Sequence, residues 1–226
     1  MAPSRRIPPK TTSTPGHFWS RKNGGTLVPV ESMLEFNFCV NLELDESVAC
    51  FESQPPPKIE FWRGRRKCYA FPDFLVRFDA RLGRSAAIVD VLREERLIKN
   101  WVHLKPRLRA ACGYARANAM TYHLRTQRKI LTPFFYNARR LLRYLREEPD
   151  PKFEAVFLGA LSKLKTASFQ QLFDECYGDS AEKAEALTTL WTLITHRKIW
   201  CDLNLPMDTS DFKLSLKSDS FDEKIA

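Results

Sequence analysis

The sequence of 226 residues lacks any long apolar run. No stretch approaches the roughly 20 apolar residues that a membrane-spanning helix needs. The N-terminal region is rich in Arg and Pro and has no apolar stretch of the kind found in secretory signals. These absences predict a soluble, cytosolic protein with no membrane partner.

The sequence also lacks paired cysteines. Its six cysteines never form a C-x-x-C pair and never fall near a histidine at ligand spacing. This pattern is typical of reduced, mostly buried thiols and argues against a structural zinc site. A glycine-rich phosphate loop and a Ser/His/Asp order are missing too, so neither indicates a rival enzyme class.

Acidic residues are absent from one long segment. Residues 96–146 contain thirteen Lys or Arg and no Asp or Glu, within a chain whose formal net charge is +9. Neutralisation of phosphates supplies most of the sequence-independent affinity for DNA. We therefore expect double-stranded DNA as a partner, the alternative being a basic face that only keeps the protein soluble.

Where acids do occur, two of them interrupt apolar runs. Residues 69–78 read as a strand entered through a proline and contain Asp73, and residues 86–92 form a second β-branched run that contains Asp90. A turn at residues 81–84 would place the two strands side by side. Their carboxylates could then meet at one end of the sheet and hold a hard divalent cation.

A helix is predicted upstream, over residues 29–45, from apolar residues that repeat at i+4. Glu35 lies on the flank of that apolar stripe, which by itself indicates an exposed helical glutamate. Glu31, one turn earlier, is the competing candidate for a site residue. A short strand follows at residues 48–51 and is ended by the prolines that begin at Pro55.

The order of these motifs resembles the PD-(D/E)xK nuclease fold, and in particular TnsA, the endonuclease subunit of heteromeric TnsA/TnsB/TnsC transposases. The resemblance covers residues 29–147. It is carried by Glu31-Ser32-Met33-Leu34-Glu35, Glu52-Ser53-Gln54-Pro55, Pro72-Asp73-Phe74-Leu75-Val76 and the carboxylate of Asp90. It implies an α/β fold with a restriction-endonuclease-like central mixed sheet flanked by helices.

The resemblance also implies an activity, a cofactor and partners. The implied enzyme hydrolyses the non-transferred, 5′ strands at transposon ends with Mg²⁺ or Mn²⁺. It works with a TnsB-like transposase and, through its C-terminal region, with a TnsC-like ATPase. Glu35, Asp73 and Asp90 would be its catalytic metal ligands.

The chain departs from the family pattern at one position. Leu92 stands where the family carries a lysine near the scissile phosphate. Three explanations stay open. Arg93 or Lys99 could replace the lysine, or a partner could supply the cation. Alternatively, the nuclease could be impaired, and the chain would then serve as a DNA-binding assembly adaptor.

Two groups of arginines are candidate DNA contacts. The first is the tip of a hairpin formed by residues 59–62 and 67–71, and the second is a ridge on a helix that begins at Thr132 and runs through Tyr144. The hairpin arginines are Arg63, Arg65 and Arg66, and the helical ones are Arg139, Arg140 and Arg143.

The composition predicts four segments. Residues 1–28 read as a flexible basic arm, 29–148 as the nuclease-like domain, 149–217 as a small winged-helix-like α+β domain, and 218–226 as a polar tail. Three short helical patterns followed by two strands give the winged-helix order. Since this domain is less basic than the rest, it could contact either DNA or a partner protein.

Overall fold

The computed structural model describes residues 15–56, 58–178, 182–207, 209 and 211–216. The chain divides into two compact units, residues 1–131 and 132–226. Each unit has its own sheet and its own buried core. The predicted tail at 218–226 and the first fourteen residues of the predicted arm lie outside the described residues.

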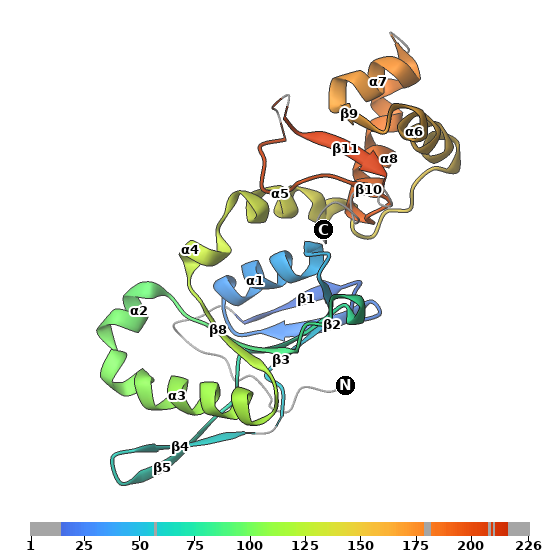
Figure 1. Cartoon of the computed structure of the whole chain (residues 1–226). Coiled ribbons are helices and arrows are strands. Elements are labelled where there is room, and N and C mark those ends of the chain that lie inside the picture. The colour runs from blue at the N-terminus through green and yellow to red at the C-terminus, as the bar shows by residue number, and fades with distance from the viewer. Residues whose placement is uncertain (1–14, 57, 179–181, 208, 210, 217–226) are drawn as a thin grey trace. The chain divides into compact units, whose positions relative to one another are not determined.

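The first unit contains the following elements, which are labelled in Figure 1: β1 (Gly16–Ser20), β2 (Thr26–Val30), α1 (Met33–Leu44), β3 (Val48–Ser53), β4 (Ile59–Arg63), β5 (Arg66–Ala70), β6 (Phe74–Phe78), η1 (Ala80–Leu82), β7 (Ala87–Val91), α2 (Glu94–Lys99), α3 (Trp101–Ala117), β8 (Thr121–Arg125) and α4 (Gln127–Ile130).

A four-stranded sheet in the order β3-β6-β7-β8 forms the centre of this unit. The first three strands are antiparallel, whereas β8 runs parallel to β7. Helix α1 packs Phe38 against Phe74, with ring centroids 5.3 Å apart, and helix α3 packs Ala115 into a cluster with Leu75. Because Phe74 and Leu75 are consecutive in β6, the two helices cover opposite faces of the sheet. The expected mixed central sheet flanked by helices is therefore present.

The expected arm at residues 1–28 is wrong for its second half. Strands β1 and β2 form an antiparallel hairpin, in which the ring of Phe18 packs edge-on against Phe36 of α1 at 5.3 Å. Buried Ser20 donates a 2.7 Å hydrogen bond to Glu43 Oε2. Gly24 and Gly25, at φ of 71° and 77°, supply the left-handed turn between the strands. The alternation of buried residues along two five-residue strands is too short to be recognised within a polar, basic segment.

The same hairpin shortens the predicted first helix. Val30 pairs with Gly16 in the strand ladder, so α1 begins at Met33 rather than at residue 29. Ser32 is the N-cap, and its side chain accepts a hydrogen bond from the Glu35 amide.

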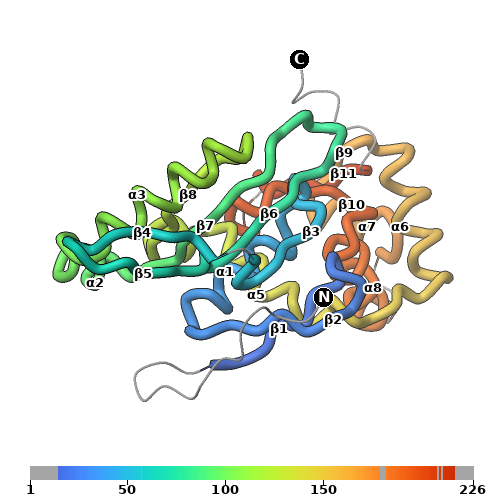
Figure 2. Tube along the Cα trace, turned by 90° about the horizontal axis from the view of Figure 1, so that it is seen from below, coloured from blue at the N-terminus to red at the C-terminus, as the bar shows by residue number. Residues whose placement is uncertain are grey.

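Strands β4 and β5 form a separate antiparallel hairpin, as predicted, with Gly64 in the left-handed region at its tip. Strand β4 packs along α3, and the hairpin can be followed beside that helix from two directions (Figure 1; Figure 2). The hairpin is thus an extension of the first unit rather than part of its central sheet.

The second unit contains α5 (Pro133–Leu141), η2 (Leu142–Tyr144), α6 (Pro151–Leu164), β9 (Thr166–Ser168), α7 (Phe169–Tyr177), α8 (Lys183–Thr195), β10 (Ile199–Trp200) and β11 (Lys213–Leu216). The strands form an antiparallel sheet in the order β10-β11-β9. The predicted three helices followed by two strands are confirmed, whereas the three-residue β9 was not predicted. Phe157 and Leu190 are fully buried in the core.

The boundary between the units differs from the predicted one at residues 148 and 149. Helix α5 packs against α8. The side-chain amide of Asn137 donates to the carbonyl oxygens of Leu203 and Leu205 at 2.9 and 2.8 Å. The Pro-rich acidic segment 147–151 is therefore a connection within the second unit, before α6, and α5 belongs with the helices that follow it.

Candidate functional site

Asp73 lies in the connection between β5 and β6, immediately before the first residue of β6. Its Oδ2 accepts a 2.7 Å hydrogen bond from the backbone amide of Val91, and its own carbonyl oxygen accepts one of 2.9 Å from the amide of Gln54. The residue is thereby tied to the end of β7 and to the end of β3. The prediction placed Asp73 inside a strand, but Pro72 cannot donate to a ladder and the strand begins after it.

Asp90 lies within β7 and is fully buried. Side chains alternate along a strand, so Asp90 is on the same face as Ile88, which packs with α3. Its Oδ2 accepts a 2.8 Å hydrogen bond from the hydroxyl of Tyr122 in β8. A buried carboxylate requires such partners, and a cation as well, to offset the loss of its hydration.

Arg107 of α3 supplies that cation. Its Nη2 donates to Asp90 Oδ1 and lies 3.4 Å from Asp73 Oδ1. The two aspartates thus meet at one end of the sheet, as the sequence predicted, but they meet at a guanidinium group. Arg107 itself was not predicted. One feature of the sequence could have indicated this role: Arg107 lies on the same face of its helix as Leu104 and Leu108, which are both buried.

One guanidinium does not offset the negative charge of this site. Burial raises the pKa of Asp73 to about 8, the charges of Asp90 and Glu35 add to the increase, and Arg107 opposes it. The pKa of Tyr122 is also raised, by burial first and then by Asp90, so its hydroxyl stays protonated as a donor. Near neutral pH the Asp73 carboxyl group is therefore largely protonated unless more positive charge arrives.

Glu35 is buried, contrary to the exposed position that its helical pattern indicated. Its Oε1 accepts from the Ser32 hydroxyl at 2.9 Å, and its Oε2 accepts from the Glu31 amide at 2.7 Å. Glu31, the competing candidate, accepts at Oε1 from Gln54 Nε2 at 2.5 Å. Glu35 is close enough to raise the pKa of Asp73.

The donor set at this site suits a hard divalent cation. Carboxylate oxygens are the ligands that Mg²⁺ prefers, and two aspartates converge on one arginine here. Within the described part of the chain, however, no group of three or more His, Cys, Asp or Glu is arranged to hold a metal ion. Arg107 holds the place between Asp73 and Asp90. For the two aspartates to bind a cation, the Arg107 guanidinium would therefore have to move away from them.

The residues at and after the family's lysine position do not place a basic group against Asp73 and Asp90. Leu92 is buried in an apolar cluster with Leu104 and Leu108. Arg93 precedes α2 and Lys99 ends it, and both are exposed. Of the cations considered, the one in contact with the acid pair is Arg107, fifteen positions beyond Leu92 in the sequence.

The predicted DNA-contacting arginines fall in different units. Arg63, Arg65 and Arg66 are exposed at the tip of the β4–β5 hairpin, where Arg63 Nη2 lies 3.5 Å from the carbonyl oxygen of His103 in α3. The exposed residues Arg139, Arg140 and Arg143 belong to the second unit.

The two units differ strongly in charge. Residues 1–131 contain 23 Lys or Arg and 12 Asp or Glu, whereas residues 132–226 contain 13 and 15. The excess of positive charge therefore lies in the unit that contains the acid pair and the basic hairpin. A polyanion is expected to be attracted to that unit.

The six cysteines are all free, as predicted, but the expectation that most of them are buried is wrong: only Cys39 and Cys201 are buried, and the other four are partly exposed. Among the described residues no helix has the length and apolar character needed to cross a membrane.

Comparison with known proteins adds no assignment: no family model matches the chain, and no curated protein is a significant match.

Proposed function

We propose that the chain is a metal-dependent DNA endonuclease subunit that hydrolyses the non-transferred strands at transposon ends, together with a TnsB-like transposase and a TnsC-like ATPase. One observation carries the proposal. Asp73, directly before β6, and Asp90, within the adjacent strand β7, converge on a single basic group at one end of the mixed sheet. The order of Glu35, Asp73 and Asp90 along the chain supports it through the resemblance to TnsA.

In this proposal Asp73 and Asp90 hold a Mg²⁺ or Mn²⁺ ion, and Glu35 completes its surroundings. The ion, when bound, activates a water molecule and polarises the scissile phosphate. Tyr122 and the Val91 amide hold the two aspartates in place by hydrogen bonds to one oxygen of each carboxylate. Because these donors belong to β8 and β7, the acid pair is oriented before any substrate binds.

Arg107 takes the role of the missing lysine. If the acid pair held a cation, the Arg107 guanidinium, on its long side chain, would be available to bind the scissile phosphate. Guanidinium groups bind phosphate through paired hydrogen bonds and keep their charge at any physiological pH. The proposal therefore needs neither Arg93 nor Lys99.

The DNA path runs over the first unit. The exposed tip arginines of the β4–β5 hairpin and the positive charge of residues 1–131 provide phosphate contacts. We assign the first unit to the restriction-endonuclease-like fold and the second unit to a winged-helix-like fold. Their order of elements supports both assignments.

A second candidate function has its own support. Arg107 already neutralises Asp90 and contacts Asp73, and Leu92 removes the family's lysine. A chain with this arrangement could be a nuclease-fold subunit that no longer cuts and serves as a DNA-binding assembly adaptor.

A strand-cleavage assay separates the two candidates. The complete transposase complex is incubated with a transposon-end duplex and Mg²⁺ or Mn²⁺, and nicking of the 5′ strands is measured. The endonuclease proposal expects cleavage by the wild-type chain and its loss in Asp73→Ala. Asp79→Ala is the matched control, because Asp79 is an aspartate of the same unit whose partner is Arg81, not the acid pair.

Equal cleavage by the wild-type and Asp73→Ala complexes would refute the endonuclease assignment. Normal assembly on DNA without 5′ cleavage by the wild-type complex would favour the adaptor.

A further inference from the structure

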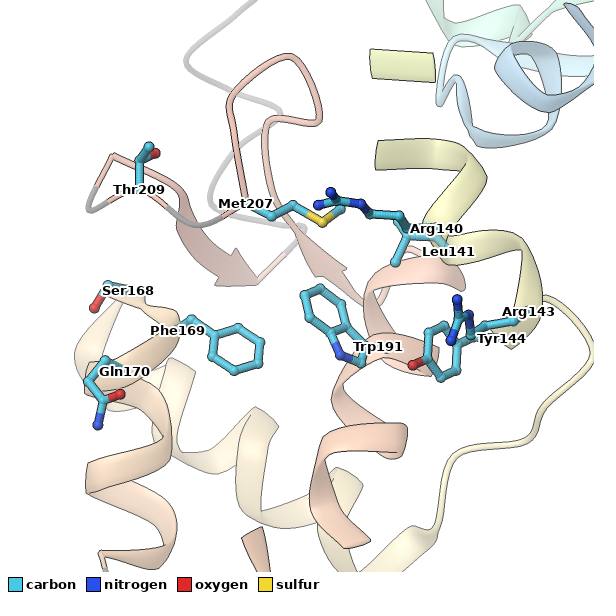
Figure 3. A pocket seen from close by; sticks show the side chains of 10 residues that line it. All are labelled: Arg140, Leu141, Arg143, Tyr144, Ser168, Phe169, Gln170, Trp191, Met207 and Thr209. Carbon is cyan, nitrogen blue, oxygen red and sulfur yellow. The ribbon is translucent and has the colours of Figure 1, made fainter. Parts of the chain in front are cut away.

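A cavity of about 710 Å³ lies within the second unit (Figure 3). Its apolar wall is formed by Leu141, Phe169, Trp191 and Met207. This volume is in the range of pockets that bind ligands or peptide side chains. Neither the acid pair nor the basic hairpin contributes to the cavity, so it is a feature separate from the proposed cleavage site.

The aromatic part of the wall is held in place by the core. The rings of Phe169, the first residue of α7, and Trp191 of α8 stack at a centroid distance of 5.1 Å and an interplanar angle of 28°. Fully buried Leu172 and Leu190 anchor the same two helices. Both rings are only partly buried and border the open space of the cavity in Figure 3. A preformed apolar surface of this kind binds without the cost of ordering it first.

Two cations border this surface. Arg140 of α5 and Arg143 of η2 are exposed and line the same cavity, and no Asp or Glu is among the described residues that line it. Figure 3 shows both arginine side chains among those that line the cavity. A ligand that fills the cavity therefore has an apolar part and negative charge next to it.

The charge of the whole unit argues against DNA as that ligand. Residues 132–226 contain more acidic than basic residues, 15 against 13, so the unit as a whole does not attract a polyanion. A DNA backbone also has no apolar group to place against Phe169 and Met207. An acidic peptide with a large apolar side chain satisfies both the wall and the two arginines.

We infer that this cavity is a docking site for an acidic segment of a partner protein. An aromatic or large aliphatic side chain of the segment fills the space between Phe169, Trp191 and Met207, and neighbouring carboxylates pair with Arg140 and Arg143. The site does not depend on the proposed nuclease activity, and it assigns the second unit to protein recognition.

The test is a selection from a library of random peptides displayed on phage, with the full-length chain as bait. Enrichment of sequences that combine Asp or Glu with Phe, Tyr, Trp or Leu is expected. A selected peptide is then measured by fluorescence anisotropy against the wild type and the double variant Arg140→Glu/Arg143→Glu. The double variant is expected to bind about tenfold more weakly or worse, because two exposed attractions to the carboxylates of the peptide become repulsions.

Arg139→Glu is the matched control. Arg139 is an exposed arginine adjacent to Arg140 on α5 but does not line the cavity, so its reversal is expected to change peptide affinity by less than about twofold. Met207→Ala tests the apolar wall at a partly buried loop position and is expected to weaken binding several-fold.

Three results would overturn the inference. One is the absence of any enriched peptide, and another is enrichment of basic or uncharged sequences. The third is a loss of duplex DNA affinity that is equal in Arg139→Glu and in the double variant, which would make these arginines a DNA-binding ridge instead.

Discussion

The ion pair between Arg107 and Asp90 gives the sharpest stability prediction. The Asp90 side chain is fully buried, and the Arg107 side chain is only 19% exposed. Removing one partner therefore leaves the charge of the other buried and uncompensated. Breaking such a pair costs about 3 to 5 kcal/mol. At roughly 2 to 4 °C per kcal/mol for a chain of this size, Arg107→Gln is expected to lower the melting temperature by about 6 to 20 °C.

A double-mutant cycle measured by urea unfolding isolates this interaction. Asp90→Asn and Arg107→Gln are each expected to destabilise the first unit, and the double variant is expected to lose less than the sum of the two. The coupling should be about 1 to 3 kcal/mol, since the residues are in direct contact. Additive effects, or a cost below about 1 kcal/mol for Arg107→Gln, would refute the buried pair.

The same variant links stability to cation binding. In Arg107→Gln a divalent cation no longer competes with a guanidinium, so Mg²⁺ or Mn²⁺ is expected to restore part of the lost stability. The gain would be about 2.7 kcal/mol at a cation concentration one hundred times the dissociation constant. In the wild type the gain should be smaller, because Arg107 must first leave the pair. A variant that cations do not stabilise at all would contradict the exchange of Arg107 with a metal ion.

Three further outcomes follow from the structure. The raised pKa of Asp73, about 8 against 3.8, stabilises the fold fully below about pH 4, and this contribution is lost as pH rises through about 8. Urea unfolding should therefore show stability decreasing between those values in the wild type and a flatter profile in Asp73→Asn; identical profiles would count against the shift. Ser32→Ala should cost about 1 kcal/mol in thermal unfolding, because it removes the N-cap bond to the Glu35 amide and a donor to its carboxylate; an unchanged melting temperature would contradict the cap. Charge reversal at Arg65 and Arg66 should weaken duplex DNA binding and reduce the salt slope by about one per lost phosphate contact, and an unaltered slope in anisotropy titrations would remove them from the interface.

The strands that bear the acid pair were predictable because their signal is local. Residues 74–78 and 87–91 are short β-branched or aromatic runs with a connection between them, and strands of this kind pair with their neighbours. Their adjacency in the sheet then brings Asp73 and Asp90 together without further information. The helices of the second unit were found for a similar reason, since their apolar residues repeat at helical spacing.

Arg107 was not predictable in the same way. Its contact with the acid pair depends on how α3 crosses the sheet, which is a tertiary property that no spacing in the sequence reveals. Arg93 and Lys99 are near Leu92 in the sequence, but both are exposed on or beside α2. Proximity in the sequence was a poor guide, because the acid pair contacts Arg107 of α3 and not a residue of α2, the helix that directly follows β7.

The N-terminal hairpin and the domain boundary show a second limit. Composition assigned Phe18 and its neighbours to a polar arm, although the ring is buried against α1. The prolines and acids around Pro149 suggested a boundary, whereas the amide of Asn137 binds α5 to the loop after β10. In both places a few long-range contacts outweigh the average character of the segment.

The account depends most on the exchange of Arg107 for a divalent cation at Asp73 and Asp90, and anomalous diffraction from crystals grown with duplex DNA and soaked in Mn²⁺ tests this directly. The account predicts an anomalous peak from a Mn²⁺ ion coordinated by one carboxylate oxygen of each aspartate. The Arg107 guanidinium should then have moved away from Asp73 and Asp90 and towards a phosphate. A guanidinium still bonded to Asp90, with no peak at saturating Mn²⁺, would contradict it.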